Sequence, residues 1–122
     1  AILACGVMVA EALDAAENLS KEGIQATVVD VHTLKPFDHE TMTSIAQKCG
    51  AIVTAEDHSI IGGLGGAVAE SLATNHPTPL EQVGVEDVFG MSGQPAELME
   101  HYGLTMSDIV KSAHKAIARR TS

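Results

Sequence analysis

The hydrophobic positions of the chain form four short, mostly apolar runs separated by longer amphipathic segments. The runs cover residues 1–4, 24–31, 51–55 and 80–85, and their apolar positions hold Ala, Ile, Leu and Val. Short runs of this kind, rich in β-branched residues, are typical of strands that are buried on both faces of a sheet. The sequence therefore predicts four buried strands.

The amphipathic segments repeat their apolar residues at helical spacing and carry helix start and stop signals. A proline at position 95 also predicts the first turn of a short helix. The longer predicted helices run from Met8 to Gly23, Asp38 to Gly50, Ala67 to Thr74 and Thr105 to Arg120. Strands alternate with helices along residues 1–122, so we expect a single α/β domain with a largely parallel sheet between helical layers.

Composition and charge narrow the classes of function. The formal net charge is -9 and the basic residues do not cluster, which argues against nucleic-acid and membrane-surface binding. Aromatic residues make up 2% of the chain, so we expect an aliphatic core. We expect a cytoplasmic protein without a signal peptide, and free thiols at Cys5 and Cys49. The apolar run begins at Ala1 without a lead-in, so we expect a fragment of a larger enzyme or subunit.

The segment 56–66 carries the most chemistry. It reads Glu-Asp-His-Ser-Ile-Ile-Gly-Gly-Leu-Gly-Gly and joins the third predicted strand to the following helix. Such a loop places two carboxylates and an imidazole at a strand end, and it turns backbone N–H groups toward whatever lies above the helix. We expect a ligand or a protein neighbour in that space. The candidate site residues are Glu56, Asp57, His58, Gly62, Gly63, Gly65 and Gly66.

The glycines of this segment allow two interpretations. Gly63 and Gly65 supply half of a dinucleotide-binding fingerprint, but Val68 stands where a third small residue is needed, and the neighbouring acids would repel a pyrophosphate. Tight packing of the helix against the sheet also requires small residues, and we favour it. His58, next to Asp57, has the chemistry of a general acid or base, but we favour a hydrogen-bonded position at a domain or subunit contact.

Other candidate sites are weaker. The remaining histidines form no zinc-binding motif, and a metal site built from His32, His58 and Asp57 or Asp30 is disfavoured, so we expect no metal. No serine or cysteine has the context of a nucleophile, so we assign no catalytic residue. The loop at residues 88–95 fits two interpretations equally well, a contact surface and an ordinary connection between a strand and a helix.

Several motifs in order resemble the C-terminal domain of transketolases. The pattern Glu-Asp-His-x-x-x-Gly-Gly-x-Gly at 56–65 is the closest likeness. The segments 30–38, 88–98 and 101–105 match the second-strand exit and the tail of the same domain. The likeness covers nearly all of the chain.

The resemblance implies a three-layer αβα sandwich with a mixed, mostly parallel sheet of about five strands, one of them antiparallel. It also implies a parent enzyme that moves two-carbon ketol units between sugar phosphates in a pentose-phosphate type of reaction. That parent uses thiamine diphosphate with a divalent metal such as magnesium, bound by preceding domains across a homodimer interface. The domain alone binds no cofactor under this interpretation. Its role is structural, and residues 56–66 form a contact edge.

The same resemblance leaves alternatives. The partner of the domain is a preceding pyrimidine-binding domain or, in a split transketolase, a separate N-terminal subunit. Deoxyxylulose-phosphate synthases share this domain, as do the beta subunits of 2-oxoacid dehydrogenases, where it docks another protein. A standalone module that binds a nucleotide or another small ligand is the alternative from a different class.

Overall fold

The fold is an ordered alternation of strands and helices. It was obtained as a computed structural model of residues 1–122, which describes residues 1–5, 8–31, 39–59, 64–85 and 105–120. The elements are β1 Ile2–Ala4, α1 Met8–Lys21, β2 Val28–Asp30, α2 His39–Cys49, β3 Ile52–Ser59, α3 Leu64–Asn75, β4 Leu80–Val85 and α5 Met106–Ala118.

The four strands form one parallel sheet in the order β2-β1-β3-β4. β1 lies inside the sheet, and its Leu3 pairs with Val29 on one side and Thr54 on the other. The predicted α/β class and the parallel sheet are confirmed. Every strand pair in the described part of the chain is parallel, so the antiparallel fifth strand implied by the resemblance stays a prediction.

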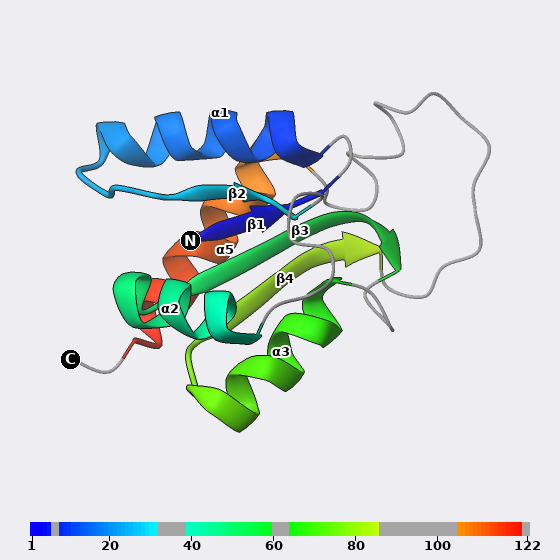
Figure 1. The fold of residues 1–122 in the computed structure, drawn as a ribbon. Coiled ribbons are helices and arrows are strands. Elements are labelled where there is room, and N and C mark those ends of the chain that lie inside the picture. The colour runs from blue at the N-terminus through cyan, green and yellow to red at the C-terminus, as the bar shows by residue number, and fades with distance from the viewer. Residues whose placement is uncertain (6–7, 32–38, 60–63, 86–104, 121–122) are drawn as a thin grey trace.

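Helices cover both faces of the sheet, which gives the three predicted layers (Figure 1). α1 and α5 lie on one face and α2 and α3 on the other. Side chains alternate between the faces along each strand. In β3, Val53 and Ala55 point toward α1 and α5, while Ile52 points toward α2 and α3.

The core is accordingly split in two. The first core lies under α1 and α5, and its buried residues are Ile2, Ala4, Met8, Ala12, Ala15, Leu19, Val53, Ala55, Val83, Ile109 and Ala113. The second core lies under α2 and α3, and its buried residues are Leu3, Val31, Met42, Ala46, Ile52, Val68 and Leu72. All of these side chains are aliphatic, as the composition predicted.

Local sequence signals set several element ends. Gly23 follows α1 with φ of 82° and Gly50 follows α2 with φ of 75°, a left-handed conformation that favours glycine. At the start of α5, the backbone N–H of Thr105 donates to the carboxylate of Asp108 over 3.0 Å. This is the reciprocal half of a capping box. The predicted helix ends at these three places are confirmed.

The second strand is shorter than predicted. β2 covers only Val28–Asp30, because its ladder partner β1 has only three residues, Ile2–Ala4. Ile24 and Ala26 do not extend the strand, and they pack partly buried against the first core instead. The apolar run predicted burial here, but the length of the neighbouring strand decided where the hydrogen-bonded ladder stops.

No helix in the ranges described above combines the length and the apolarity that a bilayer crossing requires.

Candidate functional site

The candidate site is the junction between β3 and α3, and its elements differ from the predicted ones. β3 runs to Ser59, so Glu56 and the two residues after it belong to the strand rather than to a loop. α3 begins at Leu64, which places Gly65 and Gly66 in its first turn. The predicted strand end at Ala55 and the predicted helix start at Ala67 are therefore wrong.

Pairing with β4 explains the longer strand. Ala55 pairs with Val83, and the next registered pair is Ser59 with Val85. β3 therefore advances four residues while β4 advances two, which is a bulge-like irregularity. The neighbouring strand supplies hydrogen-bond partners beyond the apolar run, and hydropathy alone does not reveal such partners.

Glu56 lies inside the fold. Its relative exposure is 2%, and one carboxylate oxygen accepts the backbone N–H of Gly65 over 2.8 Å. The first N–H groups of a helix have no partner within the helix and carry the positive end of its dipole. The Glu56 carboxylate thus satisfies one of these groups and ties the end of β3 to the start of α3.

Gly65 touches β4 on the same face. A Cβ atom added to Gly65 would overlap the Oε1 atom of Gln82 and would lie 2.9 Å from its Cγ atom. The same construction at Gly66 meets nothing within 4 Å. The atoms in the way belong to the exposed side chain of Gln82 and not to the backbone of β4, so the interpretation of tight helix–sheet packing stays a prediction.

The structure gives less information about the other candidate residues. Gly62 and Gly63 fall in an undescribed range, as do His32, the 88–95 loop and the helix predicted from Pro95. Asp57 and His58 are placed as strand residues only. Their assignment to a contact edge stays a prediction. Among the described residues no three His, Cys, Asp or Glu side chains gather as metal ligands, and Cys5 and Cys49 form no disulfide.

Two buried polar side chains near this junction were not predicted. Thr54 is fully buried on β3, and its hydroxyl has no hydrogen-bond partner among the described residues. Ser71 is 1% exposed on α3, and its Oγ atom lies 2.8 Å from the Nδ1 atom of His39 on α2. One signal was present in the sequence: Ile52, Thr54 and Glu56 alternate with apolar residues in β3, which places two polar side chains on one covered face.

The contacts at this junction have a structural role, because they hold the start of α3 against the end of β3. The N–H group of Gly65 that a phosphate would need is already bonded to a carboxylate. The buried charge of Glu56 would also repel a diphosphate placed over α3. This arrangement argues against the nucleotide-binding alternative at the start of α3.

Comparisons with known proteins point in one direction. A sequence profile for the family "Transketolase, C-terminal domain" matches residues 1–109. The chain is 55% identical over 119 residues to the 6-deoxy-6-sulfo-D-fructose transketolase subunit SqwH of a Clostridium species, a match that covers 98% of this chain and 37% of that protein. It is 38% identical to the 1-deoxy-D-xylulose-5-phosphate synthase of Trichormus variabilis, covering 94% of this chain and 18% of that protein.

Solved structures show the same likeness to transketolases. A structure described as a split-gene transketolase, inactive beta4 tetramer, superposes with a TM-score of 0.92 at 52% identity, covering 98% of this chain and 39% of that one. Transketolase from Leishmania mexicana superposes with a TM-score of 0.66 at 22% identity, covering 99% of this chain and 16% of that one, which is a likeness of fold alone. The chain spans little more than a third of the first relatives' length.

Proposed function

The chain belongs to the transketolase C-terminal domain family, and from that premise we propose that it is the C-terminal domain of a transketolase-like enzyme. The parent transfers two-carbon ketol units between sugar phosphates. The observation that carries the proposal is the match over 98% of the chain to a subunit of a split-gene transketolase, with a TM-score of 0.92. The relative SqwH is also named as a transketolase subunit.

The domain itself has a structural role in this proposal. It packs against the preceding pyrimidine-binding domain, or against a separate N-terminal subunit, and it supports a homodimer in the cytoplasm. The split-gene relative described as an inactive beta4 tetramer supports the idea that a subunit containing this domain is catalytically incomplete without its partner. Asp57, His58 and the glycines at 62 and 63 form the contact edge. Glu56 and Gly65 hold that edge in place from inside the fold.

The parent uses thiamine diphosphate and a divalent metal, and both are bound outside this domain. The residues described here do not suit a diphosphate, because the N–H group of Gly65 at the start of α3 is occupied by the Glu56 carboxylate. We therefore assign no cofactor contact to the described residues at the start of α3.

A deoxyxylulose-phosphate synthase is the second candidate for the parent, favoured by the 38% identity over 94% of the chain. The two candidates differ in substrate. The synthase interpretation predicts formation of 1-deoxy-D-xylulose 5-phosphate, whereas the transketolase interpretation predicts transfer of a ketol unit between sugar phosphates.

Reconstitution tests the proposal. The natural polypeptide that carries this sequence is purified, its intact mass is measured, and it is combined with the upstream polypeptide where the gene is split. We expect ketol transfer only when both parts, thiamine diphosphate and magnesium are present. Calorimetry with this chain alone should show no heat with thiamine diphosphate, NAD or sugar phosphates.

Two results would contradict the proposal. Heat from one of those ligands with this chain alone would favour a standalone binding module. A natural polypeptide near 12.7 kDa that neither binds an upstream subunit nor restores ketol transfer would remove the chain from a transketolase altogether.

A further inference from the structure

β4 lies at one end of the sheet, and no described strand pairs with its outer side. The carbonyl of Pro79, just before β4, accepts the N–H of Ile52 in β3 over 2.9 Å, so it points into the sheet. Backbone groups alternate in direction along a strand, so those of Leu80, Gln82 and Gly84 point to the outer edge. Such an edge is a template for pairing with another strand unless it is blocked.

The helix beside this edge leaves room for a further strand. A groove of about 350 Å³ separates part of α3 from β4, and its wall includes Leu72, Leu80 and Gln82. α3 lies next to β4 in Figure 1, but the Gln82 side chain between them is exposed. The side chains of an added strand would therefore enter the groove on this face, and α3 does not protect the edge.

A charged side chain from the other face of the sheet covers part of the edge. Arg119 follows α5, and its guanidinium donates to the outward carbonyl of Leu80 over 3.0 Å. The guanidinium is also bonded to one carboxylate oxygen of Glu81, whose other oxygen lies 3.8 Å from the Nζ atom of Lys115. Exposed ion pairs contribute little to stability, so the more specific consequence of this contact is an occupied edge carbonyl.

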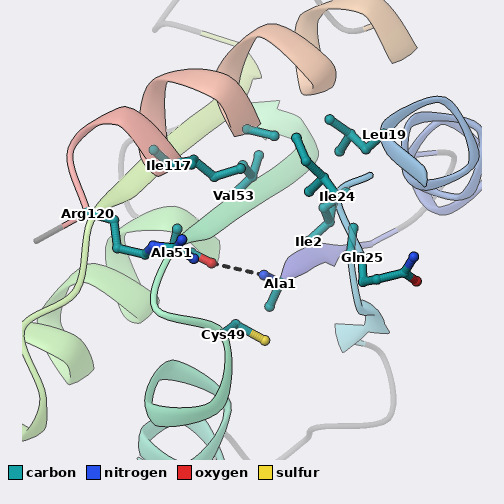
Figure 2. Close-up of a pocket in the computed structure, with 13 residues that line it drawn as sticks. Ala1, Ile2, Leu19, Ile24, Gln25, Cys49, Ala51, Val53, Ile117 and Arg120 are labelled. Atoms are coloured by element: carbon teal, nitrogen blue, oxygen red, sulfur yellow. Dashed lines mark hydrogen bonds between the residues drawn. The ribbon is translucent and has the colours of Figure 1, made fainter. Parts of the chain in front are cut away.

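The next residue has different neighbours. Arg120 lines a small hollow of about 80 Å³, shown in Figure 2. Its Cδ atom lies 3.0 Å from the position that a Cβ atom of Gly50 would take, so its aliphatic stem packs over the glycine that follows α2. Arg120 therefore offers a matched control for Arg119, with the same charge at a different contact.

We propose that Arg119 blocks the outer edge of β4 against pairing with the β4 edge of a second copy of this chain. Two such edges are complementary when they run antiparallel about a two-fold axis at Gln82, because the two Gln82 residues then exchange both backbone hydrogen bonds. In that register the N–H of Gly84 in one copy needs the carbonyl of Leu80 in the other, and Arg119 already holds this carbonyl. This role of Arg119 does not depend on the proposed function.

Sedimentation velocity tests the role of Arg119 in the natural polypeptide that carries this sequence. The parent and its variants are run over a range of concentrations, and association beyond the parent's own assembly is measured. We expect Arg119→Ala to lower the Kd of this association roughly 10-fold, because one edge hydrogen bond is freed in each of the two copies. Glu81→Gln loosens the guanidinium and should lower the Kd about threefold. Arg120→Ala should leave it unchanged.

Net charge does not account for the expected change. The chain has a formal net charge of -9, and the loss of an arginine makes it more negative, which by itself disfavours association. Arg119→Ala and Arg120→Ala change this charge equally, so a difference between them reports the contact with the edge.

Hydrogen exchange locates the pairing. At a concentration where Arg119→Ala associates, the peptide that spans β4 should exchange its outward amides about 10-fold more slowly than in the parent, because they gain partners. The peptide that spans β2, at the other end of the described sheet, is the internal control and should not change.

Three results would each overturn the role of Arg119 and leave the proposed function standing. Equal association of the parent and Arg119→Ala would show that Arg119 does not block the edge. Equal gains in Arg119→Ala and Arg120→Ala would show a general loosening of the end of α5. Association of Arg119→Ala without slower exchange in β4 would place the contact on another surface.

Discussion

The face of the sheet under α1 and α5 is packed with aliphatic side chains, whereas the face under α2 and α3 also buries polar ones. Among the described residues, no buried polar side chain lies on the first face. On the other face, Thr54, Glu56 and Ser71 are all less than 3% exposed. Both helix layers pack on the same four strands. The difference in buried polar side chains therefore reflects different roles of the two helix layers.

Apolar burial holds helices against a sheet without fixing their exact position, because it has no preferred direction. Hydrogen bonds do have direction. On the second face, Glu56 fixes the first turn of α3 to the end of β3, and the His39–Ser71 contact links α2 to α3. The comparison indicates that hydrogen bonds to buried groups position the layer of α2 and α3. The directional contacts of α1 and α5, His114–Glu22 and Arg119–Glu81, lie at the exposed surface instead.

The largest effect should come from the buried carboxylate. Glu56→Ala leaves the N–H of Gly65 buried without its partner and removes packed atoms, so we expect a loss of about 3 kcal/mol in the free energy of unfolding. Glu56→Gln keeps an acceptor and should lose about 1 kcal/mol. Urea unfolding measures both. Glu70→Ala, on the exposed side of α3, is the control. A loss as large as that of Glu56→Ala would show that the hydrogen bond between Glu56 and Gly65 makes no specific contribution to stability.

Next in size is the close approach at Gly65. Gly65→Ala forces the exposed side chain of Gln82 to turn away, and we expect a net loss of about 1 kcal/mol in the free energy of unfolding. Adding Gln82→Ala should restore most of that loss in a double-mutant cycle. Gly66→Ala faces open space and should gain about 0.5 kcal/mol, because alanine is the better helix former. Equal effects of alanine at 65 and 66 would contradict the packing interpretation.

The two buried hydroxyls should respond in opposite directions. Thr54→Val removes a hydroxyl that has no partner among the described residues, and we expect a gain of about 1 kcal/mol in the free energy of unfolding. Ser71→Ala removes a hydroxyl bonded to His39, so a loss of about 1 kcal/mol is expected. Thermal unfolding of both variants at one pH tests the pair. A loss for Thr54→Val would mean that its hydroxyl has a partner in the folded protein.

The smallest effect is expected at the first face, where α5 meets β4 through charges. Arg119→Ala breaks the contacts with Glu81 and Leu80, but the Arg119 side chain is 55% exposed. Exposed ion pairs contribute little, so we expect a loss of about 0.5 kcal/mol at low salt and less near 1 M salt. Lys111→Ala on the outer side of α5 is the control. A loss above that of Gly65→Ala would reverse the order proposed for the two faces.

Hydrophobic periodicity determined most of the fold. The apolar runs located all four strands, the 3.6-residue repeats located α1, α2 and α5, and glycines marked the ends of α1 and α2. These signals act over a few residues, so a single sequence reveals them. The alternation of strands and helices along the chain added the helical layers on either side of the sheet.

The structure decided what depends on neighbours distant in sequence. The pairing of β3 with β4 extended the third strand through Glu56, and α3 began before the alanine-rich run because the Glu56 carboxylate caps it from nine residues away. Gly65 in α3 lies against the side chain of Gln82 on β4, a contact that no local pattern encodes. Propensity and periodicity describe each segment alone, whereas the ends of strands and helices and the partners of buried polar groups are set by what the fold brings beside them.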